Sequence, residues 1–194
     1  MGRPRSFDAD EALDAAMRLF WRTGYDGTSL ADLTDAMGIN RRSLYATFGN
    51  KEDLFHLVVR RYEEGPGRFF AEAVGQPTGR GTAEYLLHAA ADSFTDPGLP
   101  SGCFLVQGGP ACDPDGPPAA YATLAEHRRI STEMLRERLE RARAEGDLPA
   151  DADPAFLATY LSTVLQGLSI QASSGTPRAE LHRLADFALA SWPS

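Results

Sequence analysis

The sequence predicts an all-α protein in which a short N-terminal domain of three helices precedes a larger helical domain, with about nine helices in all. Two observations support this fold class. Apolar residues recur at helical spacing along most of the 194 residues, and no segment keeps the alternation that is typical of a β-strand. Helix-capping residues precede many of these periodic segments, and glycine- or proline-rich segments separate them.

The first two predicted helices have clear boundary residues. Asp8 can cap the first helix, and Glu11, three residues later, can complete a capping box. Gly24 suits the left-handed conformation that commonly follows a helix end. Thr28 can cap the second helix, and Gly38 permits the turn that ends it. The pattern therefore predicts two helices that a short loop connects.

Two asparagines mark the starts of the next helices. Asn40 can cap a third helix over residues 41–48, and Asn50 can cap a fourth. The fourth helix meets the segment Gly65-Pro66-Gly67, where an interior proline removes a backbone hydrogen bond at a cost of ~3 kcal/mol. We therefore expect a connecting helix over residues 51–74 that is kinked near residues 65–67.

Helical periodicity continues to the end of the chain. It predicts helices over about 82–95, 119–145 and 154–173, a short apolar segment at 102–107, and a last helix ending near Trp192. Asp153 can cap the helix over 154–173, and Pro154 suits its first position. This helix is apolar around much of its circumference, so more than one of its sides needs a partner. The last two helices therefore form either a subunit interface or the interior of a single subunit.

Composition limits the classes of protein to which the chain can belong. No apolar run approaches the ~18 residues of a membrane span, and the N-terminus lacks the apolar stretch of a signal peptide. Two cysteines do not make a disulfide scaffold. We therefore expect a cytoplasmic protein without a membrane partner. The four histidines lack metal-ligand spacing, and no glycine-rich phosphate loop is present, so we expect no metal, no cofactor and no enzymatic activity.

The net charge of −8 is unevenly distributed. Residues 1–62 hold nine basic and nine acidic residues, whereas residues 63–194 hold ten and eighteen. All of the excess negative charge therefore lies outside the N-terminal segment. Local basic groups in that segment can still neutralise phosphates, although the chain as a whole is acidic.

Residues 28–51, TSLADLTDAMGINRRSLYATFGNK, have the pattern of a helix-turn-helix. Two short helices flank a tight turn, and the second helix begins with paired arginines. In a helix-turn-helix the second helix enters the DNA major groove. The segment therefore indicates binding to double-stranded DNA. The remaining helices are then available for a sensor and a dimer interface.

Candidate DNA contacts cluster at the two helix starts. Thr28 and Ser29 lie where free backbone N–H groups and hydroxyls can bind a phosphate. Arg41, Arg42 and Ser43 begin the predicted recognition helix. An arginine there can donate two hydrogen bonds to a guanine, which provides ~1–3 kcal/mol of discrimination. Either one arginine reads a base while the other contacts the DNA backbone, or both contact phosphates only.

Further candidates flank the recognition helix. Thr47 can contact a phosphate or a thymine methyl group. The only lysine of the chain, Lys51, has a compact ammonium group suited to a phosphate. Arg3 and Arg5 form a short basic arm before the first helix. Such an arm either enters the minor groove or clamps phosphates, or it is a mobile tail with no fixed role.

The N-terminal third of the chain resembles the DNA-binding domain of TetR-family transcriptional regulators. The similarity spans about residues 7–62 and includes an amphipathic first helix followed by GYDGTSLADLTDAMGINRRSLYATFGNKEDLF. Residues that fit the family pattern are Gly24, Thr28, Gly38, Leu44, Tyr45, Phe48, Lys51 and Leu54. The resemblance implies that Tyr45 contacts the DNA backbone and Lys51 a phosphate.

Two features depart from the family pattern. Many relatives have glycine or another small residue in the first turn of the recognition helix, where this chain has Arg41 and Arg42. The operator sequence therefore does not carry over. The break at residues 65–67 interrupts the helix that connects the DNA-binding and ligand-binding domains in the family, so the coupling geometry does not carry over either.

The resemblance also implies the organisation and function of the whole chain. Residues 1–50 form the DNA-binding domain, and residues 51–194 form a helical domain for ligand binding and dimerisation. The protein is then a homodimeric repressor, paired through its last two helices, that a small molecule releases from a palindromic operator. Candidate residues lining the ligand cavity, each of which has core packing as its alternative, are Phe69, Phe70, Tyr85, Cys103, Phe104, Gln107, Tyr121, His127, Met134, Tyr160 and Gln166.

Two other functions remain open on this scaffold. Some family members have a cysteine in a segment like SGCFLVQ that responds to oxidants or electrophiles, so Cys103 is a candidate redox sensor. The alternative for Cys103 is a buried, inert thiol that acts as a small apolar residue. The chain could also be a helical interaction module whose helix-turn-helix no longer binds DNA.

Overall fold

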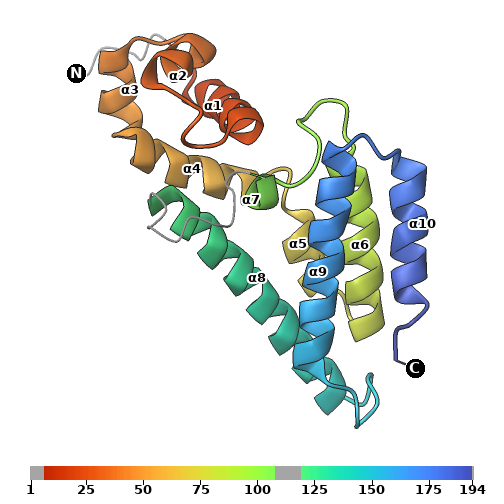
Figure 1. The fold of residues 1–194 in the computed structure, drawn as a ribbon. Helices are drawn as coiled ribbons and strands as arrows, with labels where there is room; N and C mark the ends of the chain where they lie inside the picture. The colour runs from red at the N-terminus through yellow and green to blue at the C-terminus, as the bar shows by residue number, and fades with distance from the viewer. Residues whose placement is uncertain (1–6, 108–118, 194) are drawn as a thin grey trace.

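The computed structural model describes residues 7–107 and 119–193. Within these ranges the chain is all-α and contains no strand, as predicted. The ten helices (Figure 1) are α1 (Ala9–Thr23), α2 (Leu30–Met37), α3 (Arg41–Phe48), α4 (Lys51–Glu64), α5 (Phe69–Val74), α6 (Gly79–Phe94), α7 (Phe104–Gln107), α8 (Ala119–Ala144), α9 (Pro154–Ser173) and α10 (Arg178–Leu189). The number exceeds the expected nine because the connecting helix is divided into α4 and α5.

Helices α1, α2 and α3 form a compact N-terminal unit at one end of the molecule (Figure 1). The Asp8 carboxylate caps α1 by accepting hydrogen bonds from the backbone N–H groups of Asp10 and Glu11. Helix α2 is capped by Ser29 rather than by Thr28, which the sequence had predicted. The prediction for Thr28 was wrong because its hydroxyl lies inside the fold, where it donates to the carbonyl oxygen of Gly24 at 2.6 Å.

Helix α4 connects the N-terminal unit to the rest of the protein. It contacts α1 on one side and α8 on another. Its buried residues, Leu54, Phe55, Val58, Val59 and Tyr62, recur at helical spacing along its length. The same helix therefore belongs to the core of both parts.

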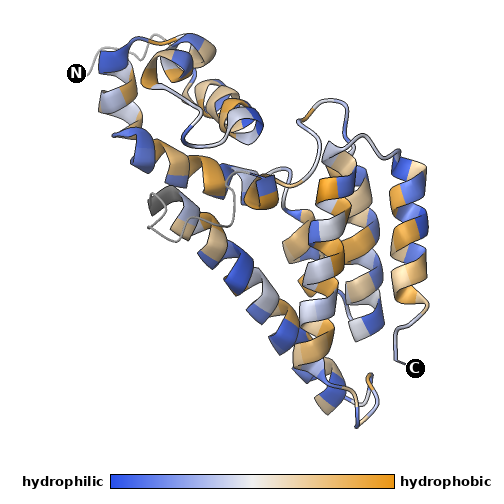
Figure 2. Cartoon of the chain, viewed as in Figure 1, coloured by the Kyte–Doolittle hydropathy of each residue, from blue (hydrophilic) through white to orange (hydrophobic). Residues whose placement is uncertain are grey.

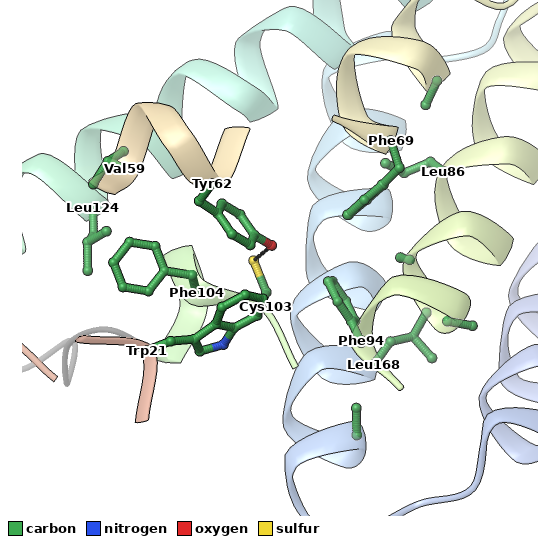
Figure 3. Packing of buried hydrophobic residues seen from close by; sticks show 14 of the residues in the cluster. Trp21, Val59, Tyr62, Phe69, Leu86, Phe94, Cys103, Phe104, Leu124 and Leu168 are labelled. Carbon is green, nitrogen blue, oxygen red and sulfur yellow. Dashed lines mark hydrogen bonds between the residues drawn. The ribbon is translucent and has the colours of Figure 1, made fainter. Parts of the chain in front are cut away.

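The core where the two parts meet is aromatic (Figure 3). The Phe104 side chain of α7 is fully buried. Its ring centroid lies 6.2 Å from Trp21, 5.7 Å from Phe55 and 5.6 Å from Tyr62. Aromatic pairs at such distances contribute ~0.5–1.5 kcal/mol each beyond the burial of their surfaces. We call Trp21, Phe55, Tyr62 and Phe104 the aromatic junction.

The helix breaks next to this junction. Helix α4 ends at Glu64, and α5 begins at Phe69. The backbone N–H of Gly67 donates to the carbonyl oxygen of Tyr62 at 2.7 Å, so the chain folds back over the end of α4. A Cβ atom at Gly67 would lie 2.8 Å from the Tyr62 ring, which is too close for any other residue without movement. The turn therefore needs glycine at this position.

The C-terminal part is a bundle in which α6 packs against α5, α9 and α10 (Figure 1). Small buried residues of α6, including Ala83, Ala90 and Ala91, allow the neighbouring helices to approach closely. Helix α8 contacts α4 near one end of the bundle and packs along α9. Hydrophilic residues are frequent on α8, whereas α9 is largely apolar (Figure 2). Asp153 caps α9, and Pro154 is its first residue, as the sequence predicted.

The aromatic junction leads to a stability prediction. Replacement of Phe104 by alanine should lower the free energy of unfolding by about 3–5 kcal/mol, because a fully buried ring is lost and a cavity is left. The matched control is Tyr45→Ala, which removes an aromatic ring that is 49% exposed and should change stability by less than about 1 kcal/mol. Urea denaturation followed by circular dichroism measures both. Equal effects for the two variants would contradict the role given to Phe104.

Candidate functional site

Helix α3 presents a polar, partly basic face to solvent. Asn40 caps the helix by accepting a hydrogen bond from the Ser43 backbone N–H at 2.9 Å. The helix buries Leu44 and Phe48, and this fixes which side faces outward. Arg41 and Arg42 are exposed, and no carboxylate in residues 7–107 or 119–193 pairs with either of them. Both guanidinium groups are therefore available to a partner molecule.

The other candidates on α3 follow from the same orientation. Tyr45, one turn after the paired arginines, is 49% exposed, which is unusual for an aromatic side chain. Ser43 and Thr47 are half-buried at the edges of the exposed face. The structure thus brings Arg41, Arg42 and Tyr45 together on one surface. Arg3 and Arg5 lie outside the described residues.

The start of α2 differs from the expected phosphate site. Thr28 is buried, and its hydroxyl is 2.6 Å from that of Thr23. The backbone N–H of Ser29 donates to the Asp32 carboxylate at 2.8 Å, in a capping box. Hydrogen bonds from the Ser29 side chain and from the Ser29 backbone lower the pKa of Asp32 and keep a negative charge at the helix start. Thr28 therefore cannot reach a phosphate, and of the two only Ser29 remains on the surface.

Lys51 is the first residue of α4 and is held by an aromatic ring. Its Nζ lies 4.2 Å from the centroid of the Tyr25 ring, a cation–π geometry. Partial burial lowers the pKa of the ammonium group, and the nearby charge of Asp26 opposes this shift. Asn50 caps α4, so Lys51 lies at the start of this helix, a few residues after the end of α3. Its position is therefore fixed before any partner binds.

A cavity of about 360 Å³ lies in the C-terminal part. Residues of α4, α5, α7, α8 and α9 line it, so it adjoins the end of the connecting helix. A volume of this size is typical of small-molecule sites. Six of the eleven residues predicted for a ligand cavity contribute to its lining: Phe69, Phe70, Cys103, His127, Met134 and Gln166.

Two of the remaining candidates, both on α7, have partners outside the cavity. Phe104 belongs to the aromatic junction, which the periodicity of a four-residue segment could not reveal. Gln107 donates its side-chain amide to the backbone carbonyl oxygen of Ser169 at 3.4 Å. Neither residue lines the cavity, because α7 turns these side chains toward α4 and α9. For Phe104 the alternative of core packing was correct.

Three tyrosines that were predicted to line the cavity lie outside it, and their hydroxyls have other hydrogen-bond partners. Tyr85 donates to Glu72 at 2.5 Å on the surface between α6 and α5. Tyr121 donates to Asp26 at 2.8 Å and so connects α8 to the N-terminal unit. Tyr160 donates to a backbone carbonyl oxygen of α10 at 3.2 Å. The prediction that these tyrosines line the cavity was wrong, since sequence alone does not reveal such distant partners.

The cavity lining also contains two charged residues, Glu63 and Arg128, that the sequence pattern did not indicate. His127 of α8 lies 2.6 Å from the Glu63 carboxylate of α4. This hydrogen bond raises the pKa of His127, although partial burial opposes the shift. Arg128 follows His127 and also lines the cavity. Nothing in the local sequence marks Glu63, because its partner lies on a helix far away in the chain.

Cys103 belongs to the cavity lining but is buried, and its thiol lies beside Tyr62 (Figure 3). The Tyr62 hydroxyl donates to its Sγ at 3.2 Å, and its backbone N–H donates to the Ser169 hydroxyl at 2.8 Å. Burial raises the pKa of the thiol. Because the thiolate is the reactive form, this environment favours an inert Cys103 over a reactive one. No other cysteine lies within the described ranges.

Residues 7–107 and 119–193 contain no group of three or more His, Cys, Asp or Glu side chains that could hold a metal ion. None of the helices in these ranges is long and apolar enough to cross a membrane.

The Glu63–His127 pair predicts a specific pH dependence. A raised pKa in the folded state means that the pair stabilises the protein below the ordinary histidine pKa of 6.5 and loses this effect as the pH rises through the raised value. The stability advantage of the wild type over Glu63→Gln should therefore shrink between pH 6 and pH 9. Urea denaturation at several pH values measures it. For Glu180→Gln on α10 the difference from wild type should stay constant, and a constant difference for Glu63→Gln would contradict the prediction.

Comparison with known proteins places the chain in a family. The family described as bacterial regulatory proteins, tetR family, matches residues 12–58, and the tetracyclin repressor-like C-terminal domain matches residues 84–186. The HTH-type transcriptional repressor ComR of Escherichia coli (strain K12) is 38% identical over 198 residues, which cover 99% of this chain and 92% of that protein. The two matched segments of the chain are separated by a short stretch, and this stretch includes the break between α4 and α5.

Two solved structures are similar to this chain in both fold and sequence. A cysteine-substituted variant of the TetR family transcriptional regulator CifR, complexed with 26-base-pair operator DNA, is 42% identical and superimposes with a TM-score of 0.91 over 98% of this chain and 100% of that chain. A putative TetR transcriptional regulator from Rhodococcus sp. RHA1 is 41% identical, with a TM-score of 0.65 over 94% and 97% of the two chains. The chain therefore belongs to the TetR family of bacterial transcriptional regulators.

Proposed function

We propose that the protein is a homodimeric repressor that binds a palindromic operator through α3 and leaves the DNA when a small molecule occupies the cavity. In this proposal residues 1–50 bind DNA, and residues 51–194 bind the effector and form the dimer. The observation that carries the proposal is the exposed face of α3, on which Arg41, Arg42 and Tyr45 lie together. The CifR variant, which has the same fold, was solved on operator DNA, and ComR is a repressor.

Each DNA-facing residue has a proposed role. Arg41 and Arg42 reach the major groove, where a guanidinium group can donate two parallel hydrogen bonds to guanine or bind a phosphate. Tyr45 and Thr47 contact the DNA backbone beside them. Lys51, fixed over the Tyr25 ring, binds a phosphate next to the groove. The exposed hydroxyl of Ser29 is a further phosphate contact.

The proposed dimer uses the last two helices. Their outward faces carry large apolar side chains that a monomer leaves in water: Phe156 and Ile170 on α9 are 66% and 50% exposed, and Leu184 and Phe187 on α10 are 40% and 80% exposed. Exposed apolar residues gathered on two adjacent helices are typical of a protein interface. A second copy of the chain would cover them in a four-helix arrangement, which also sets the distance between the two α3 helices.

The effector site in this proposal is the cavity of about 360 Å³. Its wall includes Tyr62 and Glu63, which lie in the last turns of α4. A ligand changes DNA affinity only if it binds the DNA-bound and free conformations with different affinity. Contact with α4 is a route to such a difference, because α4 packs against α1 as well as α8.

Removal of the paired arginines tests DNA binding. Arg41→Ala/Arg42→Ala should weaken binding to the DNA upstream of the protein's own gene by about tenfold or more and reduce the salt dependence of binding, because phosphate or base contacts are lost. Gel shifts across a salt series measure both quantities. Arg80→Ala/Arg129→Ala, which removes two exposed arginines from the C-terminal part, should bind like the wild type. Wild-type binding by the α3 variant, with unchanged thermal stability, would exclude α3 as the reading helix.

A charge on the exposed face of α10 tests the dimer. Phe187→Glu should convert a dimer into a monomer at micromolar concentration, since the carboxylate would be buried without a partner at the interface. Analytical ultracentrifugation reports the mass, and circular dichroism checks the fold. The control Ala125→Glu adds the same charge to an exposed position of α8 and should remain dimeric. A monomeric wild type, or a dimeric Phe187→Glu variant, would contradict the proposed interface.

A further inference from the structure

Arg128 is the charged residue of the cavity that lacks an ionic partner. Its guanidinium group donates one hydrogen bond to the backbone carbonyl oxygen of Leu105 on α7. In the part of the chain that the structure describes, no carboxylate lies within ion-pair distance of it. Its neighbour Arg129, in contrast, is paired with Glu126 at 2.7 Å on the surface. A guanidinium group has five N–H donors, so most of those on Arg128 are free of protein acceptors.

The carboxylate of the described cavity lining is not available to Arg128. Glu63 is the acidic residue of the described lining, and the His127 imidazole already occupies its carboxylate at 2.6 Å. When His127 is protonated, this pair is neutral as a unit, and the charge of Arg128 remains. Partial burial lowers the pKa of Arg128, because it removes water from around the charged group. The guanidinium group nevertheless stays protonated at neutral pH. An anion in the cavity would offset this loss of solvation.

The remaining walls are apolar. Phe69 and Phe70 of α5 line one part of the cavity, and Ile130 and Met134 of α8 another. Ile130 and Met134 are still 41% and 37% exposed, so the protein itself leaves apolar surface here without a partner. A ligand that fits must therefore combine one anionic group with an apolar body.

We propose that the effector is a small amphipathic carboxylate whose head group binds Arg128 and whose apolar part lies among Phe69, Phe70 and Met134. This inference rests on the proposed function of the cavity as the effector site. A carboxylate matches the planar guanidinium group through two parallel hydrogen bonds. A neutral or cationic ligand would leave the Arg128 charge unpaired inside the cavity.

The position of Arg128 also gives the head group a route to the DNA-binding domain. In this proposal the carboxylate draws the guanidinium group toward the ligand, which weakens its hydrogen bond to the Leu105 carbonyl oxygen. Leu105 directly follows Phe104, whose ring packs against Trp21 of α1 and Tyr62 of α4. Loss of the hydrogen bond to Leu105 would release α7, and α7 holds the aromatic junction. The ligand thereby acts on the N-terminal unit although no described residue of α1, α2 or α3 lines the cavity.

A matched set of probes tests the chemical class of the ligand. 4-Phenylbutyrate, its methyl ester, 4-phenylbutanol and 4-phenylbutylamine share an apolar body and differ in the head group. Isothermal titration calorimetry and ligand-observed NMR with the full chain should show binding of the acid at least about tenfold tighter than that of the other three compounds. In Arg128→Gln this preference should disappear, whereas Arg129→Gln should keep it. The comparison of acid and ester in the wild type remains informative even where Arg128→Gln folds poorly.

The outcomes separate this inference from the proposed function. Equal or tighter binding of the ester, alcohol or amine would overturn the inference, and so would no detectable binding of any probe at millimolar concentration. An acid preference that survives Arg128→Gln would also overturn it. If the acid binds through Arg128 but the operator complex persists in gel shifts, the inference stands and the effector role of the cavity fails.

Discussion

The contact of Phe104 with Trp21, Phe55 and Tyr62 is the constraint on which the rest of the structure depends. These four rings come from α1, α4 and α7, and they join the N-terminal unit to the helices around the cavity. Close-packed interiors do not deform gradually, so a change at one side of such a cluster shifts whole helices. Tyr62 belongs to the cluster and also lines the cavity, where its hydroxyl donates to Cys103.

Electrostatics complements this packing. Several arginines in the C-terminal part, such as Arg129 and Arg136, pair with carboxylates on their own helix. Arg41 and Arg42 have no such partners within the described ranges. An acidic protein can therefore present a basic helix to DNA, while its acidic remainder is repelled from the phosphates.

Much of the fold could be predicted from the sequence because local signals determine helix ends. Asp8, Asn40, Asn50 and Asp153 each cap a helix where the sequence placed one. The assignment at Thr28 failed because two neighbouring residues could cap α2, and only tertiary packing selects between them. The cavity was less predictable. Glu63 and Arg128 acquire their roles from partners on distant helices. The same is true of the tyrosines whose hydroxyls are hydrogen-bonded outside the cavity. Helical periodicity in the sequence contains no information about such pairs.

Hydrogen exchange followed by mass spectrometry tests most directly whether the aromatic junction connects the two parts of the protein. In Phe104→Ala the amides of α1 and of the last turns of α4 should lose protection, while those of α6 and α10, which do not contain junction residues, should keep it. Such a pattern would mean that α7 holds the DNA-binding unit in place. Uniform loss of protection across all helices, or no loss in α1, would contradict the central position of the junction.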